Sequence, residues 1–171
     1  MSGIEHREEA PKNLHVGVIT TSDSRAEAAE KGEDKDLSGP IIQEKLEKEE
    51  HSSDRVVIPD DEEKIKTEIM NFVKDSKVDA VITTGGTGIT SRDKTVDVAR
   101  SLFEKELPGF GETLRRMGYE EVGGPGILTR ATAGLIKQKP VFCLPGAPNA
   151  VKIAMDLILP DLGHLVKHAR E

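Results

Sequence analysis

Short runs of apolar and β-branched residues recur along the chain and predict buried strands. Such runs, when polar or turn residues bound them, are typical of strands that are covered on both faces. There are four: His15–Thr20, Arg55–Pro59, Ala80–Thr83 and Pro140–Leu144. The last run contains the single cysteine, Cys143, which excludes an intrachain disulfide and is interpreted as a small core residue.

Between these runs, apolar positions recur at helical spacing. The clearest case follows Asp60, where Ile65, Ile69, Phe72 and Val73 share one face of a predicted helix. Further helices are expected from Ser38–Pro40 onward with Ser38 or Gly39 as the cap, over Val96–Phe103, over Thr113–Tyr119, and over Val151–Val166 with a break at Pro160.

Three segments carry no helical or strand pattern. We expect Ala26–Asp36 to be a loop that is too polar to pack, and Pro108–Glu112 to interrupt the helix before it. No element is assigned to Ile127–Gly134.

Strands that alternate with helices predict an α/β fold. We expect a three-layer sandwich with a mainly parallel β-sheet covered by helices on both faces. The 171 residues fit one domain, which we assign to residues 13–171 after a flexible N-terminal tail at 1–12. The charged tail lacks a signal core, and the longest apolar runs are far shorter than the roughly 20 residues of a membrane helix. A cytoplasmic protein without a membrane partner is therefore expected.

All four predicted strands end in unusual residues. Ser22 and Asp23 follow the first strand, Asp60 the second, Gly85–Gly88 the third, and Pro145–Gly146 the fourth. Ligands of open α/β sheets bind beyond the carboxyl ends of parallel strands. We therefore expect one crevice at this edge of the sheet.

The stretch Thr83–Gly88 combines a strand end with three glycines just before a helix. It matches neither the P-loop nor the dinucleotide-binding pattern, so standard NTPases and dehydrogenases are disfavoured. Glycines let a ligand approach the backbone, and the N–H groups there can bind an anion. The alternative is a tight turn without a ligand.

Asp60 and Asp93 each allow two interpretations. Asp93 lies just before the helix at Thr95, and Asp60 stands three residues before Glu63, so both are candidate helix caps. Both also follow strand ends on the predicted ligand edge, where two carboxylates suit Mg²⁺ and substrate phosphates.

Other polar residues allow similar alternatives. Ser22 and Asp23 would contact a ligand or form a local turn, and Glu112 is a ligand contact or a helix-start acid. The arginines would meet phosphates or lie on solvated faces: Arg92, Arg115, Arg116 and Arg130. His164 and His168 have the spacing of a metal site without a matching acidic ligand, which favours a structural role.

The charge balance argues against a nucleic-acid partner. The net charge is −7, with 31 acidic and 24 basic residues and no Lys/Arg block. One tyrosine and four phenylalanines offer little surface for stacking bases.

The ordered set of motifs resembles the molybdopterin adenylyltransferase family of molybdenum cofactor biosynthesis proteins, in particular its MoaB-like branch. The similarity covers Leu14 to the C-terminus. The motifs that carry it are Ser22-Asp23, Asp36–Pro40, Ile58–Asp61, Thr83–Gly88, Ser91–Thr95, Pro108–Glu112 and Leu144–Pro148.

This resemblance implies an activity and an assembly. Family members have an α/β sandwich fold, are trimers or dimers of trimers, and transfer AMP from ATP to the terminal phosphate of molybdopterin with Mg²⁺, releasing pyrophosphate. Asp60 and Asp93 would be the catalytic aspartates and the Mg²⁺ ligands. The substrate-binding residues would be Ser22, Asp23, Thr84, Gly85, Gly86, Thr87, Gly88, Glu112, Thr129, Pro145 and Gly146.

Two other functions fit the same fold. One is a non-catalytic molybdopterin-binding or scaffold protein of the pathway, and the other is a nucleotide pyrophosphatase. The resemblance also implies a downstream metal-insertion protein as a partner, and leaves molybdenum or tungsten open as the final metal.

Overall fold

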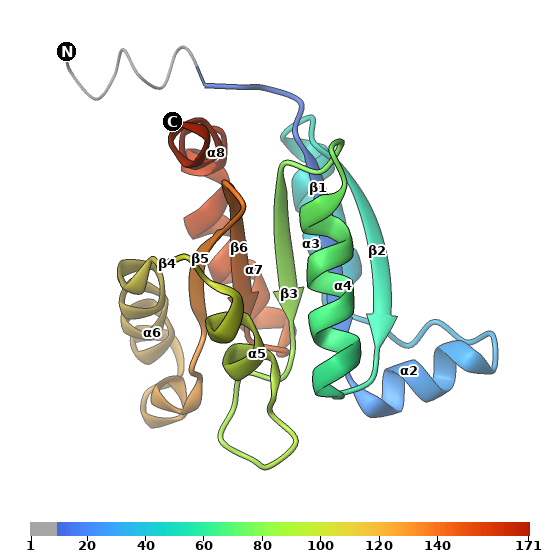
Figure 1. The fold of residues 1–171 in the computed structure, drawn as a ribbon. Coiled ribbons are helices and arrows are strands. Elements are labelled where there is room, and N and C mark those ends of the chain that lie inside the picture. Colours follow the sequence, from blue (N-terminus) through green and yellow to red (C-terminus); the bar gives the residue numbers. More distant parts are fainter. Residues whose placement is uncertain (1–9) are drawn as a thin grey trace.

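Six strands form one sheet at the centre of the molecule, in the order β2-β1-β3-β6-β5-β4 (Figure 1). This computed structural model describes residues 10–171. The strands are β1 (His15–Thr21), β2 (Ser52–Ile58), β3 (Ala80–Thr84), β4 (Lys105–Glu106), β5 (Thr132–Ile136) and β6 (Lys139–Leu144). β2, β1, β3 and β6 are parallel, whereas β5 and β4 run antiparallel to their neighbours.

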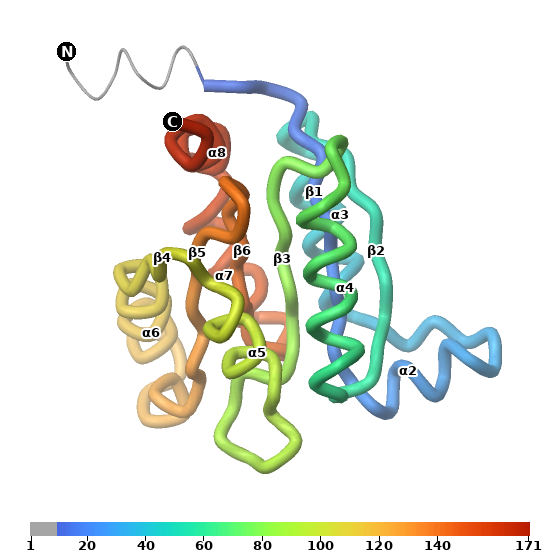
Figure 2. Tube along the Cα trace, viewed as in Figure 1, coloured from blue at the N-terminus to red at the C-terminus, as the bar shows by residue number. Residues whose placement is uncertain are grey.

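Helices connect the strands and cover both faces of the sheet, as Figures 1 and 2 show. They are α2 (Asp23–Glu30), α3 (Ser38–Lys48), α4 (Glu62–Lys74), α5 (Thr95–Leu102), α6 (Pro108–Val122), α7 (Pro148–Ile158) and α8 (Leu162–Arg170). Two short 3₁₀ helices, η1 (Gly124–Leu128) and η2 (Leu159–Asp161), complete the set. The predicted break at Pro160 is confirmed, because η2 separates α7 from α8.

Alternating side chains of the central strands build two separate cores. Val18 and Ile82 point to one face, where α3, α6, α7 and α8 pack. Val81 and Cys143 point to the other face, where α4 and α5 pack. The predicted three-layer α/β sandwich with a mainly parallel sheet is confirmed. Burial also raises the pKa of the Cys143 thiol to about 11, which agrees with a core role.

The segment predicted as the loop Ala26–Asp36 was assigned wrongly in its first half. α2 occupies Asp23–Glu30, and its Ala26 and Ala28 are buried. The Ser22 side chain accepts a hydrogen bond from Arg25 N at 3.4 Å and caps this helix. Two small alanines among charged residues are enough to pack a helix whose other faces are solvated.

The predictions around Pro108 and Thr132 also need correction. Pro108–Glu112 does not interrupt a helix, because α6 begins at Pro108, a position that suits proline in the first turn. The unassigned stretch contains the end of η1 and the start of β5. β5 pairs with β6 through a two-residue turn at Lys137 and Gln138, which have φ of 47° and 62°.

The prediction that Ser38 or Gly39 is the cap of α3 is wrong, because the N-cap position is Leu37 and no side chain at that position caps the helix. The Asp36 Oδ1 atom instead accepts hydrogen bonds from the backbone N–H groups of Ser38 and Gly39, both at 3.1 Å. Of the predicted tail at 1–12, residues 1–9 lie outside the described residues. Pro11 lies against Gly163 of α8, where a methyl group would meet the Pro11 carbonyl oxygen at 2.7 Å.

Candidate functional site

The carboxyl ends of the four parallel strands meet at one edge of the sheet. Ser22 N, after β1, donates to Ile58 O of β2 at 2.9 Å, and Gly85 N, after β3, donates to Leu144 O of β6 at 3.0 Å. A methyl group at Gly146 would lie 3.4 Å from Gly85 Cα. The predicted convergence of the strand ends is confirmed. The long loop between β3 and α5 projects from this edge (Figure 2).

The glycine loop adopts a conformation that requires glycine. Gly85 and Gly86 have φ of 99° and 66°. A methyl group added at Gly85 would lie 2.3 Å from Thr21 O, and one added at Gly86 would lie 2.3 Å from Thr95 Oγ1. Thr95 N also donates to Gly86 O at 3.1 Å, so the loop is packed between β1 and the start of α5.

Asp60 is held at the edge by a reciprocal pair of hydrogen bonds. Asp23 N donates to Asp60 Oδ2 at 3.1 Å, and Asp60 N donates to Asp23 Oδ1 at 3.0 Å. The capping alternative for Asp60 is wrong, because Asp61 caps α4 by accepting from Lys64 N at 2.9 Å. Asp60 is therefore free of a structural role in that helix.

The electrostatic surroundings of Asp60 disfavour its charge. Burial raises the pKa of its carboxyl, and the neighbouring carboxylates of Asp23 and Asp93 add to that rise. The charge of Arg92 and the hydrogen bond from Asp23 N oppose it without cancelling it. A bound cation would relieve this repulsion.

Asp23 is paired with Arg92, which reaches back from the loop after β3. Arg92 donates to Asp23 Oδ2 through Nε at 3.0 Å and through a terminal nitrogen at 2.6 Å. These bonds, together with the one from Asp60 N, lower the pKa of Asp23. Arg92 thus belongs to the site and is not on a separate solvated face.

Asp93 lies over the glycine loop. Its Oδ2 accepts from Thr90 N at 2.8 Å and from Thr90 Oγ1 at 2.7 Å, and a methyl group at Gly88 would meet that oxygen at 2.8 Å. The capping alternative is wrong here too, because no side chain caps α5, whose N-cap position is Lys94. Burial raises the pKa of Asp93, but the bonds from Thr90 and the charge of Arg130 outweigh it, so the pKa is lowered.

An apolar cavity of about 370 Å³ adjoins the loop. Its lining residues include Leu114, Val122, Thr129, Pro145 and Ile153. Thr129 Oγ1 lies 3.0 Å from Thr87 Oγ1, which joins the cavity wall to the glycine loop. The size and apolar character suit a flat heterocycle whose phosphates lie at the loop.

Most of the other predicted site residues also lie at this edge. Thr84 Oγ1 donates to Pro145 O at 2.8 Å, and Ser38 Oγ donates to Gly146 O at 2.7 Å, so two side chains fix the turn after β6. Ser22 is half-buried and serves as the α2 cap. Glu112 is exposed on α6 and does not line the apolar cavity.

The donor set suits a metal that shares its ligands with substrate. Within residues 10–171, no group of three or more His, Cys, Asp or Glu side chains is arranged to hold a metal ion. Asp60 and Asp93 supply two carboxylates, which fits Mg²⁺ because this ion keeps water and substrate phosphates in its sphere. The rings of His164 and His168 pack edge to face with their centroids 4.3 Å apart, in agreement with a structural role.

Sequence reasoning missed the roles of Asp36 and Asp97. Asp36 is nearly fully buried, and Asp97 accepts two hydrogen bonds from Arg130, at 2.8 and 3.0 Å. The bonds from Ser38 N and Gly39 N to Asp36 are local and follow a helix-capping pattern. The other partners, Thr20 and Arg55 for Asp36 and Arg130 for Asp97, are distant in sequence, so no local pattern signals those contacts. Arg130 was considered only as a phosphate ligand or a solvated residue, and its guanidinium instead binds protein groups.

In the described part of the chain, none of the helices has the length and apolar character needed to cross a membrane.

Comparison with known proteins shows the family to which the chain belongs. A family model described as "Probable molybdopterin binding domain" matches residues 17–164. The molybdopterin adenylyltransferase of Pyrococcus furiosus is 47% identical over 171 residues, covering 98% of each chain. The molybdenum cofactor biosynthesis protein B of Bacillus subtilis is 40% identical over 174 residues, covering 100% of this chain and 99% of the relative.

A solved structure shares the fold at high similarity. It is the tungsten cofactor synthesizing protein MoaB from Pyrococcus furiosus, with a TM-score of 0.83 and 47% identity, covering 95% of this chain and 100% of that chain. The family model and both relatives extend over nearly the whole chain. The chain therefore belongs to this family of molybdopterin-binding domains, as the resemblance of its motifs implies.

Proposed function

We propose that this protein is a Mg²⁺-dependent molybdopterin adenylyltransferase that acts in the cytoplasm in the biosynthesis of a molybdenum or tungsten cofactor. The observation that supports the proposal is that Asp93 lies against the glycine loop and its charge acts on Asp60 at the same edge of the sheet, in a chain 47% identical to a molybdopterin adenylyltransferase. Neither aspartate caps the helix that follows it in the chain, α4 after Asp60 or α5 after Asp93.

The chemistry needs no serine or histidine base. A phosphate monoester is largely dianionic at neutral pH, because its second pKa is about 6. A phosphate oxygen of molybdopterin attacks the α-phosphorus of ATP, the bond from that phosphorus to the bridging oxygen breaks, and pyrophosphate leaves with the electron pair. No proton is transferred in this step, so positioning and charge neutralisation supply the catalysis.

Each part of the site has a proposed task. Asp60 and Asp93 would hold Mg²⁺, which neutralises charge on the ATP phosphates. The glycine loop at Thr84–Gly88 would present backbone N–H groups to a phosphate. The apolar cavity with Thr129 and Pro145 would hold the pterin or the adenine, and Ser22, Asp23, Glu112 and Gly146 remain proposed contacts of the substrates.

The deciding assay incubates purified protein with molybdopterin, ATP and Mg²⁺ and follows adenylylated pterin and pyrophosphate. We expect both products in equal amounts, and none above background in Asp93→Asn. Absence of the adenylate in the wild type, or its unchanged formation in Asp93→Asn, would contradict the proposal. Molybdopterin binding without turnover would favour a scaffold protein, and hydrolysis of a nucleotide without pterin would favour a pyrophosphatase.

A further inference from the structure

Arg130 connects both ends of the loop that carries Asp93. Its Nε donates to Gly88 O at 2.8 Å, where the loop leaves the glycines. One terminal nitrogen donates to Asp93 O at 3.0 Å, where the loop ends. The backbone N–H of Arg130 also donates to Thr87 O at 2.7 Å. One residue therefore closes the loop at its base.

The same guanidinium is tied to α5. Its two terminal nitrogens donate to Asp97 Oδ1 at 2.8 Å and Oδ2 at 3.0 Å. Such a bidentate pair is planar and directional, and it orients the Nε group as well. The Arg130 side chain is only 32% exposed, and its three nitrogens all have protein partners. It is not available as a phosphate ligand in this arrangement.

Other contacts fix Asp93 only within its own loop. Its carboxylate bonds to Thr90 and its N–H donates to Thr90 O at 3.1 Å, so these bonds would move with the loop. Ile89, Thr90, Ser91 and Arg92 are exposed. Arg130 stands just before β5 and therefore relates the Asp93 backbone to the sheet.

We propose that Arg130 is the positioning residue for Asp93, holding its carboxylate at the glycine loop by closing the loop from Gly88 to Asp93 and clamping it to Asp97. The structural part of this inference concerns the loop alone, and its consequence for Mg²⁺ rests on the proposed function. A lysine would keep the charge but lose the planar fork that spans four acceptors. Arg130→Lys is therefore the informative variant.

The first test is hydrogen exchange, measured by NMR on the full-length protein at each amide of residues 87–94. In Arg130→Lys we expect exchange to rise about tenfold or more at Thr90 and Asp93, because the loop opens more often. Asp97→Asn should show a smaller rise. The matched control is Arg100→Lys. Arg100 is an exposed arginine of α5, the helix that carries Asp97, and its partner is Glu106. Exchange like that of the wild type in Arg130→Lys would overturn the inference.

The second test measures metal affinity by titrating free Mn²⁺, a spectroscopic stand-in for Mg²⁺. Loss of a group that orients a metal ligand typically weakens binding about tenfold or more, so we expect this in Arg130→Lys and no change in Arg100→Lys. Adenylyl transfer by Arg130→Lys should need correspondingly more Mg²⁺ for half-maximal rate while recovering most of kcat at saturation. A variant that merely unfolds in part would lose kcat at every Mg²⁺ concentration.

The outcomes separate this inference from the proposed function. A loosened loop with unchanged Mn²⁺ affinity would overturn the positioning of Asp93. A wild type that neither binds Mn²⁺ nor forms adenylate would overturn the proposed function, and the exchange at Thr90 and Asp93 would then decide the role of Arg130 by itself.

Discussion

Two adjacent aspartates, Asp60 and Asp61, have different partners although either one stands at a plausible helix start. Asp61 bonds to Lys64 N and caps α4. Asp60 bonds across to the N–H of Asp23 on another loop, and desolvation together with nearby carboxylates raises its pKa. A residue that is electrostatically unfavourable in the folded chain is a typical mark of a functional site.

We therefore expect Asp60→Asn to abolish adenylyl transfer without lowering the melting temperature. The amide oxygen can still accept from Asp23 N, while the repulsion disappears, so Tm should stay constant or rise by about 1–3 °C at pH 7. Asp61→Asn is the matched control. It should keep most of the activity, because Asp61 caps α4 and the proposed Mg²⁺ ligand is Asp60. Equal activity of the two variants would contradict these assignments.

The pH dependence of this stability difference has a definite sign. The folded-state pKa of Asp60 lies above the 3.8 of an unperturbed carboxyl, so the folded chain binds the Asp60 proton more tightly than the unfolded chain does. Ionisation of Asp60 therefore lowers the free energy of unfolding of the protein as pH rises from about 4 through the folded-state pKa of this group. Denaturation at a series of pH values should show Asp60→Asn equal to wild type at the acid end and relatively more stable toward pH 7.

A methyl group at Gly88 should displace the Asp93 carboxylate. The added carbon of Gly88→Ala would lie 2.8 Å from Asp93 Oδ2, and this oxygen belongs to a side chain that can rotate away. We expect activity to fall by about tenfold or more while the fold persists. The control is Gly109→Ala on α6, where a methyl group meets no atom within 4 Å. Activity of Gly88→Ala equal to that of this control would contradict the placement of Asp93.

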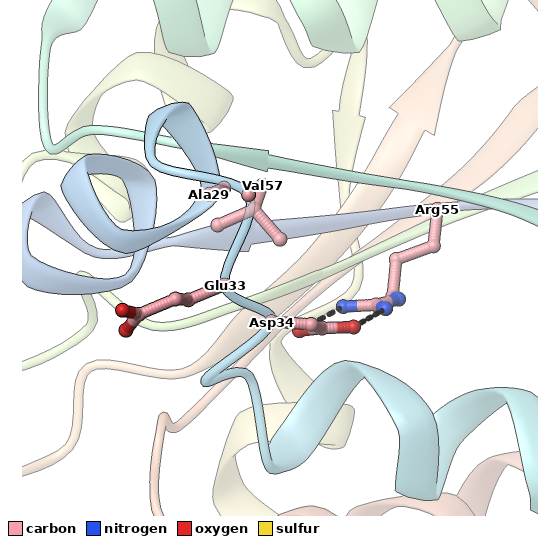
Figure 3. A pocket seen from close by; sticks show the side chains of 6 residues that line it. Ala29, Glu33, Asp34, Arg55 and Val57 are labelled. Carbon is pink, nitrogen blue, oxygen red and sulfur yellow. Dashed lines mark hydrogen bonds and ion pairs between the residues drawn. The ribbon is translucent and has the colours of Figure 1, made fainter.

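At the level of elements, α3 depends on the buried carboxylate of Asp36. This side chain accepts from Ser38 N and Gly39 N at the helix start, from Thr20 Oγ1 at 2.7 Å, and from Arg55 at 2.8 Å. Arg55 is bonded on its other side to Asp34, as Figure 3 shows. One carboxylate thus joins α3, β1 and β2.

Replacing Asp36 should destabilise the whole fold. Asp36→Asn leaves Arg55 without its buried partner and places an amide against it, which costs about 3 kcal/mol in comparable buried pairs. Chemical denaturation should show a lower midpoint with an unchanged m-value. Asp34→Asn removes the exposed partner of the same arginine and should show a much smaller loss. Similar losses in the two variants would mean that burial does not decide the strength of these pairs.

The sequence predicts most elements correctly, and the exceptions have physical causes. The parallel strands are recognisable because continuous apolar runs need both faces covered. α2 was missed because only two alanines mark its buried side. The helix predicted over Thr113–Tyr119 lies within α6, but its start was missed because a proline and two glycines stand in the first turn. β5 was missed because its burial comes from small residues, including Ala133 and Gly134, which carry little hydrophobic pattern.

The part of the candidate site that could be predicted from the sequence is the part marked by local features. Strand ends and glycines are local features, so Asp60, Asp93 and the loop could be found from sequence. The bonds from Arg92 to Asp23 and from Arg130 to Gly88 join residues 69 and 42 positions apart. Arg130 precedes β5, which is antiparallel to β6, so it reaches this edge at the start of a strand. The expectation that ligands bind beyond the carboxyl ends of parallel strands therefore does not point to it.

At the scale of the whole molecule, apolar side chains remain exposed at one end of α6 and on η1. They are Tyr119, Val122, Ile127 and Leu128, each 50–68% exposed. The resemblance implies a trimer or a dimer of trimers, and we expect a second copy of the chain to cover these residues. Solution mass by light scattering should therefore be three or six times 18.6 kDa. The double variant Ile127→Ser/Leu128→Ser should lower the mass at equal helix content, and a monomeric wild type would contradict this expectation.

The position of the C-terminal helix bears on how this protein can be handled. α8 ends beside the start of β3, where Arg170 pairs with Asp79, at the edge of the sheet opposite the loops that carry Asp60 and Asp93 (Figure 1). A fluorescent label or a purification tag joined after Glu171 would therefore lie a full strand length from the proposed site, and immobilising the protein through that tag would leave the proposed substrate side facing solution.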